Sequence, residues 1–221
     1  MRLAILGGTG KEGAGLGLRW AQAGHEIIIG SRDARRAADK AGELAAQAPA
    51  ARVQGLSNRD AATAAEVIVL ALPAAGLQQT LPEVRDGCRG KVVVSAVVPL
   101  TFGGGRLFTP PPQGSAAEEA QEILGAEARV VAAFHHIAAH ELSAAGHAID
   151  CDLLLCGGDT AARTTVAGLG ADLGLRAVDV GALTNAGPLE GITAVLATIN
   201  RRYKLKGSGI KITGLGEAHG R

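Results

Sequence analysis

Residues 2–13 read RLAILGGTGKEG and decide the fold. The apolar beginning, Arg2–Leu6, has the composition of a short buried strand, and Gly8 to Gly13 match the spacing G-x-G-x-x-G. A helical pattern follows over residues 11–23 and ends before Gly24. A glycine loop between a strand and a helix is typical of dinucleotide-binding α/β domains, in which amides at the helix N-terminus hold a pyrophosphate. We therefore predict a dinucleotide site at this loop.

Each glycine of the loop has a predicted task. Gly8 permits the tight turn, Gly10 lets the backbone approach a pyrophosphate, and Gly13 lets the helix pack closely on the strand. The alternative reading is a turn without a ligand, in a chain that contains 32 glycines. The cofactor-binding residues predicted at the loop are Gly8, Thr9, Gly10, Lys11, Glu12 and Gly13.

The rest of the chain alternates strands and helices. Apolar runs predict strands at residues 25–30, 67–72, 92–94, 129–133, 152–156 and 175–180, and helical patterns predict helices at 33–48, 115–125, 160–173 and 184–202. The strand runs are continuously apolar, which indicates strands covered on both faces. This order predicts an α/β fold of the Rossmann type, with a doubly wound, mainly parallel sheet.

Domain boundaries follow from the same pattern. We place a dinucleotide-binding domain at residues 1–180 and a small C-terminal extension of helix and strand at residues 181–221. Residues 99–115 are rich in glycine and proline and predict a surface loop. Residues 207–221 predict a short strand followed by a frayed tail.

The end of the second strand indicates which dinucleotide binds. An NAD site has an acidic residue there to hold the ribose hydroxyls, whereas this strand ends in Ser31-Arg32. A serine hydroxyl and an arginine suit a 2′-phosphate, and Arg36 lies one helical turn beyond Arg32, with Arg35 beside it. We predict NADP(H) rather than NAD(H). The alternative reading is a solvated basic face balanced by nearby aspartates.

Composition excludes several other classes. The 221 residues have a net charge of +1 and few aromatic rings (three Phe, one Trp and one Tyr), which excludes a broad nucleic-acid surface. The apolar runs are far shorter than the ~18–20 residues that cross a bilayer. Three cysteines without metal-binding spacing argue against a disulfide framework and a zinc site. We expect a cytoplasmic protein that binds no metal, nucleic acid or membrane.

Further motifs carry a family resemblance over nearly the whole chain. They are Gly7-Gly8-Thr9-Gly10, Gly30-Ser31-Arg32, Leu72-Pro73, residues 94–99, His135-His136-Ile137, Asp179-Val180-Gly181, residues 200–204 and residues 209–212. The first two are shared with other NADP enzymes, and the later ones are more specific in this order. Together they resemble the NADPH-dependent oxidoreductases of the deazaflavin coenzyme F420.

The resemblance implies reversible hydride transfer between NADP(H) and coenzyme F420. It implies that Thr9, Ser31, Arg32 and Arg36 hold the 2′-phosphate, that Leu72, Pro73, Val98 and Pro99 shape the floor under the nicotinamide, and that His135, Ile137, Gly181 and Leu183 line the deazaflavin pocket, which the C-terminal extension covers and completes. Hydride transfer between stacked rings needs few side chains. His135 is the candidate catalytic residue, because it could polarise the acceptor ring through a hydrogen bond.

Three departures from the family pattern leave alternatives open. Ala138 and Ala182 replace prolines, and Gly187 stands where an arginine is expected. A reductase of another acceptor (a flavin, a pterin or an imine) is one alternative, and a non-catalytic NADP(H) sensor is another.

Two further readings concern a metal and an oligomer. His136 and His140 are four residues apart and could share a helix face as metal ligands, but no HExxH pattern is present. We expect them instead to be surface polar residues near the mouth of the site. For the C-terminal helix we keep two expectations: a homodimer through its apolar stripe, or packing of that stripe on its own sheet.

Overall fold

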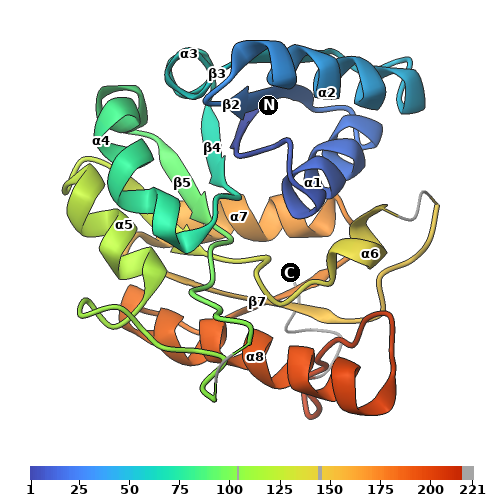
Figure 1. Ribbon diagram of the computed structural model, residues 1–221, viewed down its shortest axis with the longest axis vertical. Coiled ribbons are helices and arrows are strands. Elements are labelled where there is room, and N and C mark those ends of the chain that lie inside the picture. Colours follow the sequence, from blue (N-terminus) through green and yellow to red (C-terminus); the bar gives the residue numbers. More distant parts are fainter. Residues whose placement is uncertain (104, 144–145, 216–221) are drawn as a thin grey trace.

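The computed structural model describes residues 1–103, 105–143 and 146–215, and these form one sheet with helices on both faces (Figure 1). The strands are β1 (Arg2–Leu6), β2 (Glu26–Ser31), β3 (Val53–Ser57), β4 (Val67–Leu70), β5 (Val92–Ser95), β6 (Arg129–Ala132), β7 (Asp152–Gly157) and β8 (Arg176–Asp179). The sheet has the order β3-β2-β1-β4-β5-β6-β7-β8. Neighbouring strands are parallel except β6 and β7. The predicted α/β fold with a mainly parallel sheet is confirmed.

Helices connect the strands. They are α1 (Lys11–Gln22), α2 (Ala34–Gln47), α3 (Asn58–Ala64), α4 (Leu77–Cys88), α5 (Ala116–Leu124), α6 (Ala139–Ser143), α7 (Thr160–Ala171) and α8 (Ala186–Tyr203), with short 3-10 turns η1 (Ala74–Gly76) and η2 (Leu183–Asn185). Asp33, Ser115 and Asp159 cap the starts of α2, α5 and α7 with their side chains. In the described part of the chain, no helix is long and apolar enough to cross a membrane.

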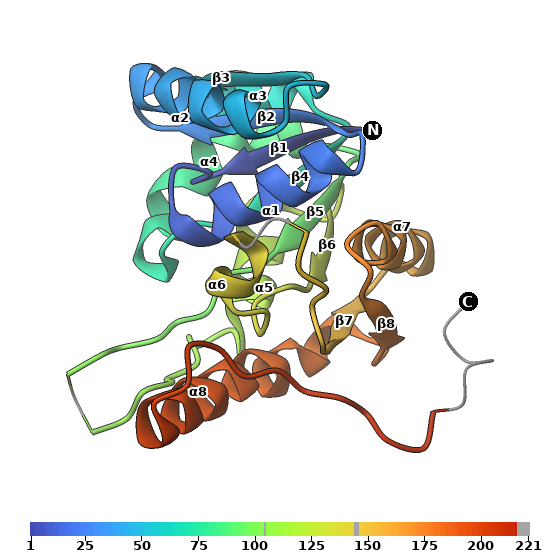
Figure 2. The same ribbon diagram turned by 90° about the vertical axis from the view of Figure 1, so that its right-hand side faces the viewer.

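Each face of the sheet has its own apolar core. Leu3 and Ile5 of β1 point to one face, which α1, α2, α6 and α7 cover. Ala4 and Leu6 point to the other face, which α3, α4, α5 and α8 cover. Figure 2 shows α7 and α8 on opposite sides of β7. Because both faces are buried, the strands can be continuously apolar, as the sequence indicated.

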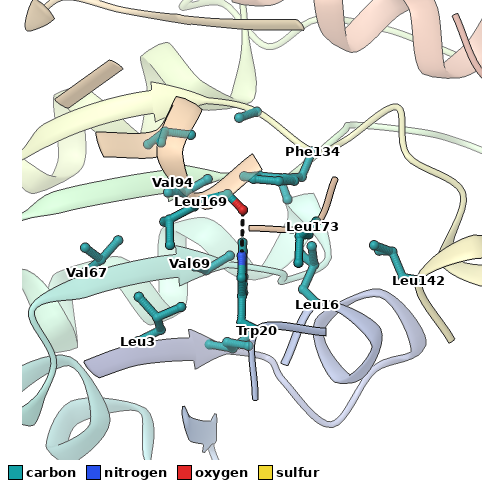
Figure 3. Close-up of a cluster of buried hydrophobic side chains, with 14 of the residues drawn as sticks. Leu3, Leu16, Trp20, Val67, Val69, Val94, Phe134, Leu142, Leu169 and Leu173 are labelled. Carbon is teal, nitrogen blue, oxygen red and sulfur yellow. Dashed lines mark hydrogen bonds between the residues drawn. The ribbon is translucent and has the colours of Figure 1, made fainter. Parts of the chain in front are cut away.

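Trp20 fixes α1 against the rest of the first core. Its Nε1 donates a hydrogen bond to the carbonyl of Leu169 in α7 at 2.9 Å (Figure 3). Its ring meets Phe134 edge to face, with centroids 5.2 Å apart and planes at 85°. Phe134 follows β6 and has a left-handed backbone, with φ of 68°. The helix that begins at the glycine loop is therefore held to both α7 and the turn after β6.

Four elements were absent from the predicted set: β3, α3, α4 and α6. The strand β3 reads VQGLS, in which Gln54, Gly55 and Ser57 interrupt the apolar run that marks the other strands. It forms because α2 packs on Gly55, where an added Cβ would lie 2.2 Å from the backbone carbon of Ala37. Short elements of this kind depend on tertiary contacts rather than on propensity.

The predicted strand near the C-terminus is wrong. The amide of Asp152 donates to the carbonyl of Ile210 at 2.8 Å, but no further ladder forms at residues 209–212. The amide of Ile212 donates instead to the Asp152 carboxylate at 2.6 Å, and the guanidinium of Arg176 donates a hydrogen bond to the carbonyl of Ile212 at 2.8 Å. The ion-paired side chains of Asp152, which is buried, and Arg176, which is partly exposed, thus hold this segment in place of a strand partner. The predicted tail beyond residue 215 lies outside the described residues.

Candidate functional site

The carboxyl ends of the central strands meet along one edge of the sheet. The register pairs Leu6 of β1 with Leu70 of β4, Leu70 with Ser95 of β5, and Ser95 with Ala132 of β6. The strand order reverses between β1 and β4, and ligands of doubly wound sheets bind at this kind of edge. Of the predicted residues, the glycine loop follows β1, Leu72 and Pro73 follow β4, Val98 and Pro99 follow β5, and His135 follows β6. Ser31 ends β2, the parallel neighbour of β1, and Arg32 comes next.

The glycine loop presents the uncapped start of α1. Gly10 is the N-cap residue, and no side chain caps the first turn. The amides of Lys11, Glu12 and Gly13 can therefore serve an anion. An added Cβ on Gly13 would lie 2.9 Å from Cα of Gly8 and 3.1 Å from Cβ of Ala71, so at Gly13 the helix packs closely on the glycine loop and on the segment just after β4.

The tight turn differs from the expectation in one detail. Gly7 has the left-handed backbone, with φ of 77°. Gly8 does not, and it is needed because an added Cβ would lie 2.8 Å from the carbonyl oxygen of Ile5. The turn therefore requires glycine at Gly7 for conformation and at Gly8 for space.

The basic residues after β2 are exposed beside the loop. Ser31 is buried, and its Oγ accepts a hydrogen bond from the amide of Asp33 at 3.2 Å. The Asp33 carboxylate accepts from the amides of Arg35 and Arg36 at the start of α2, at 2.9 and 3.3 Å. This aspartate therefore serves the helix end, while the side chains of Arg32 and Arg36 are exposed to solvent. Two exposed cations at the end of β2 fit a 2′-phosphate.

The residues predicted under the nicotinamide are fixed by an extended ladder. The amide of Ala71 donates to the carbonyl of Leu6 at 2.9 Å, and that of Ala96 donates to the carbonyl of Leu70 at 3.1 Å. These bonds lie beyond the ends of β4 and β5. Leu72 is packed against the second core, Pro73 is exposed at the start of η1, and Val98 and Pro99 are partly exposed.

His135 is buried beside α8, with 4% of its surface exposed. Neither ring nitrogen has a hydrogen-bond partner within the described residues. Burial, with a smaller effect of the neighbouring His136, lowers the pKa of His135 to about 3, although backbone groups of Ala133 and Leu189 act in the opposite direction. The imidazole is therefore neutral near pH 7 and can donate from one nitrogen and accept at the other.

Two polar contacts attach α8 near this histidine. The hydroxyl of Thr193 donates to the backbone carbonyl of His135 at 3.0 Å. The Glu190 carboxylate accepts from the amides of Ala116 and Ala117, at 3.0 and 3.1 Å, at the start of α5. Burial raises the pKa of Glu190 to about 7, and those two amides oppose the rise. Together, these contacts set the position of α8 against the edge of the sheet.

The predicted acceptor residues lie on both faces of the sheet. Gly181, with φ of 85°, precedes η2, and its carbonyl accepts from the amide of Gly157 at 2.9 Å. Leu183 packs against the second core, on the side of α8. Ile137 is buried in the first core, on the side of α1. The structure therefore groups Gly181 and Leu183 with α8 and β7 and separates them from Ile137.

Two of the departures from the family pattern, Gly187 and Ala182, lie at the start of α8 and just before η2. An added Cβ on Gly187 would lie 2.8 Å from the carbonyl oxygen of Gly114, so the loop of residues 99–115 packs directly against α8. A larger side chain at Gly187 requires this loop to move. Ala182 is exposed before η2. Within its described residues, the loop has one isolated bridge, between Leu100 and Phe108, which agrees with the predicted surface loop.

A cavity of about 180 Å³ lies between α6 and the C-terminal segment. His147 and Glu141 form an ion pair in its wall, at 3.0 Å. None of the acceptor residues predicted from sequence belongs to this wall. The cavity is lined by Ala138, Glu141, His147, Ile149, Asp150, Cys151, Gly207, Ser208 and Gly209.

The histidine pair does not form a metal site in the described residues. His136 is buried rather than at the surface, because its Nε2 lies 3.0 Å from the carbonyl oxygen of Asp152 and 3.3 Å from the amide nitrogen of Leu154. This contact ties the turn after β6 to β7. His140 is exposed on α6. No group of three or more His, Cys, Asp or Glu side chains in the described ranges is placed to hold a metal ion.

Sequence reasoning missed three polar residues at or near the site. Ser95 ends β5 and is 1% exposed, and its Oγ has no partner in the described part of the chain. Thr193 and Glu190 attach α8. No spacing in the sequence singles them out, since their partners are backbone groups far away in the chain. With His135, Ser95 leaves unpaired polar atoms that a polar ligand at this edge could satisfy.

Proteins of known name share much of this sequence. Residues 2–99 match the family described as NADP oxidoreductase, coenzyme F420-dependent. The chain is 42% identical to an F420-dependent NADP reductase of Methanocaldococcus jannaschii, covering 97% of this chain and 99% of that protein. It is 40% identical to the F420-dependent NADP reductase of Methanothermobacter thermautotrophicus, covering 98% and 97%.

A solved structure also resembles the chain throughout. It is the crystal structure of a protein of Arthrobacter sp. FB24 described as a putative F420-dependent NADP-reductase, with a TM-score of 0.82 and 27% identity. The match covers 96% of this chain and 98% of that one. Since the identity to the two reductases extends over nearly all of this sequence, the chain belongs to the family of F420-dependent NADP oxidoreductases.

Proposed function

We propose that this chain transfers a hydride reversibly between NADP(H) and the deazaflavin coenzyme F420. The observation that carries the proposal is its 42% identity, over nearly the full length, to a protein named as an F420-dependent NADP reductase. The geometry supports it, because the glycine loop, the basic residues after β2 and His135 follow strand ends on one edge of the sheet. The two coenzymes supply the reactive carbons, and the protein supplies binding, orientation and exclusion of water.

The NADP(H) half of the site uses backbone and exposed cations. The uncapped amides of Lys11, Glu12 and Gly13 bind the pyrophosphate. Arg32 and Arg36 bind the 2′-phosphate, with Thr9 and Ser31 beside them. Pro73 and Pro99 lie under the nicotinamide, next to Leu72 and Val98. The approach of these segments is close because the glycines between them carry no side chains.

The acceptor half lies between β5, β6 and the C-terminal extension of residues 181–221. The neutral imidazole of His135 donates a hydrogen bond to the acceptor ring and polarises it without releasing a proton. Gly181 and Leu183 line the side of the pocket toward α8, and Ile137 supports it from the other face. The unpaired ring nitrogens of His135 support this assignment, because a ligand would give them partners.

The direct test is anaerobic mixing of the purified protein with NADPH and oxidised coenzyme F420. We expect the absorption band of the oxidised deazaflavin to bleach, and to return with F420H2 and NADP+. His135→Ala should slow this transfer at unchanged affinity for NADPH, whereas His140→Ala, an exposed control, should not. Bound NADPH with no bleaching in either direction would contradict the proposal. Bleaching of a flavin instead would point to another acceptor.

A homodimer through the outer face of α8 is part of the proposal. Val195 and Tyr203, two turns apart, are 58% and 65% exposed, and Leu205 beyond the helix is 47% exposed. The buried side of α8, with Leu189 and Leu196, already faces its own protein, so the outer stripe is what remains for a second copy. Val195→Glu should convert a dimer to a monomer in light scattering, whereas Thr164→Glu, on the exposed face of α7, should not.

We also propose a cytoplasmic location, with small redox coenzymes as the partners. Cys88, Cys151 and Cys156 are free and buried. Burial raises the pKa of each thiol, to about 11, 11 and 12 respectively. Free buried thiols fit a reducing compartment, and labelling of all three only after unfolding is the expected result.

A further inference from the structure

Glu12 is an acid placed in the first turn of α1, among the amides that the proposed function assigns to a pyrophosphate. The side chain is partly buried overall, but its Oε1 has no exposed surface and no hydrogen-bond partner within the described residues. A desolvated carboxylate is costly unless it is paired or neutral. The backbone amide of Glu12 accounts for pyrophosphate binding, but it does not explain why a carboxyl group is buried at this position.

Helical spacing shows what covers this acid. Gly15, Leu16 and Arg19 follow Glu12 by three, four and seven residues and share its side of α1. An added Cβ on Gly15 would lie 2.7 Å from Cβ of Leu142, and Arg19 Nε donates to the carbonyl of Leu142 at 3.1 Å. Figure 3 shows Leu16 on this side as well, between Trp20 and Leu142. The helix α6 thus keeps water away from this face, and Glu12 lies at its end nearest the loop.

Burial is what governs the charge of Glu12. It raises the pKa of Glu12 to about 8, and no charged neighbour contributes. Arg19 is engaged by the carbonyl groups of Glu141 and Leu142, and Glu141 pairs with His147. The charged and titratable groups on α1 and on the elements packed against it are Lys11 and Arg19 of α1, His140 and Glu141 of α6, Arg2 of β1, Glu26 of β2, and Arg35, Arg36, Asp39, Lys40 and Glu43 of α2.

We propose that NADP(H) binds the form of the site in which Glu12 carries a proton, so that binding in alkaline solution takes up one proton at this carboxyl. The inference rests on the proposed binding of the dinucleotide at α1. A pyrophosphate on the amides of the same turn places negative charge beside Glu12, and repulsion in a dry site is strong. Glu12 is thus an affinity-determining residue that couples cofactor binding to pH. The 2′-phosphate does not explain such coupling, because phosphate monoesters ionise near pH ~6.

The first test is the pH dependence of NADPH binding between about pH 7 and about pH 9.5, measured by calorimetry. Above its pKa, the wild type should lose affinity about tenfold per pH unit. Glu12→Gln imitates the protonated acid, so whatever its affinity at pH ~7, that affinity should not fall further in alkaline solution. Glu83→Gln, on the exposed face of α4, is the matched control and should follow the wild type. A flat wild-type curve, or a Glu12→Gln curve as steep as the wild type, would overturn the proposal.

The second test needs no variant. Titrations of the wild type with NADPH near pH ~8.5, in two buffers of different ionisation enthalpy, count the protons taken up, and we expect a value between zero and about one. Zero uptake would contradict the proposal even if Glu12→Gln failed to fold. Failure of the proposed function is distinguishable, because absence of NADPH binding or of hydride transfer appears already near pH ~7, where Glu12 is protonated.

Discussion

The hydroxyl of Thr193 in α8 donates a hydrogen bond to the backbone carbonyl of His135, at 3.0 Å. This bond joins the helix of the C-terminal extension to the turn that carries the candidate catalytic residue. The two residues are separated by 58 positions in the chain. The placement of the imidazole is therefore coupled to the placement of α8.

Thr193→Val should disturb this coupling without changing the shape of the side chain. The lost hydrogen bond should destabilise the protein by about 1 kcal/mol and lower kcat/KM for F420 several-fold, with NADPH affinity unchanged. Thr198→Val is the matched control, because its hydroxyl is bonded to Ala194 within the same helix, at 2.9 Å. Equal kinetics of the two variants would show that the Thr193 contact is merely structural.

Acid should destabilise the protein through its buried histidines. The pKa of His135 is lowered to about 3 by burial, and burial lowers the pKa of His136 as well. Below pH ~6.5 the unfolded chain binds more protons than the native state. The contribution of the neutral buried histidines to the free energy of unfolding is therefore fully present above that pH, and it is lost as the pH falls toward about 3. Each histidine contributes a slope of up to about 1.4 kcal/mol per pH unit.

Burial raises the pKa values of Glu12 and Glu190, so these carboxyls make the free energy of unfolding change with pH in the opposite direction. The effect of the histidines is therefore measured by comparing variants. His135→Gln should reduce the slope of urea stability against pH, measured between about pH 4.5 and about pH 6.5. His140→Gln, which changes an exposed histidine, should leave the slope as it is in the wild type. Unchanged slopes for both variants would show that His135 is not buried in neutral form.

Arg32→Ala should discriminate between the two nicotinamide cofactors. A lost hydrogen bond to a charged phosphate is worth about 1.5–3 kcal/mol, so NADPH affinity should fall about tenfold to a hundredfold. The affinity for NADH should hardly change, since NADH has no 2′-phosphate. Arg52→Ala is an exposed control just before β3, at the amino end of the parallel strands, whereas Arg32 lies at their carboxyl end. Equal losses for NADPH and NADH would count against the role of Arg32.

Gly55→Ala should destabilise the packing of α2 on β3. The new Cβ would lie 2.2 Å from the carbonyl carbon of Ala37 and 2.3 Å from its oxygen, so backbone must move, at a cost of about 1–3 kcal/mol. Gly42→Ala, on α2 itself, meets nothing within 4 Å and should instead stabilise the helix by up to about 1 kcal/mol. Thermal unfolding measures both changes in stability. If Gly55→Ala left the stability unchanged, α2 would be able to move away from β3 without cost.

The NADP(H) half could be read from the sequence because its signals are local. The glycine loop, the strand before it and Ser31-Arg32 lie close together in the chain, and each has a spacing that chemistry explains. Apart from the short helix α6, the strands and helices of residues 129–202 were equally readable. Their pattern gave no sign of the antiparallel β7, since hydrophobic runs do not encode strand direction.

By itself, the sequence determined the Rossmann-type sheet, the loop after β1 and the basic residues after β2. Only the tertiary structure decided that Leu183 and Ile137 lie on opposite faces of the sheet, that Asp152 and Arg176 bind the segment expected to form the last strand, and that α6 packs on Gly15, on the side of α1 that carries Glu12. The physical reason is the range of the interactions. Periodicity and turn chemistry act over a few neighbouring residues, whereas burial, pairing and desolvation depend on segments that meet only when the chain has folded.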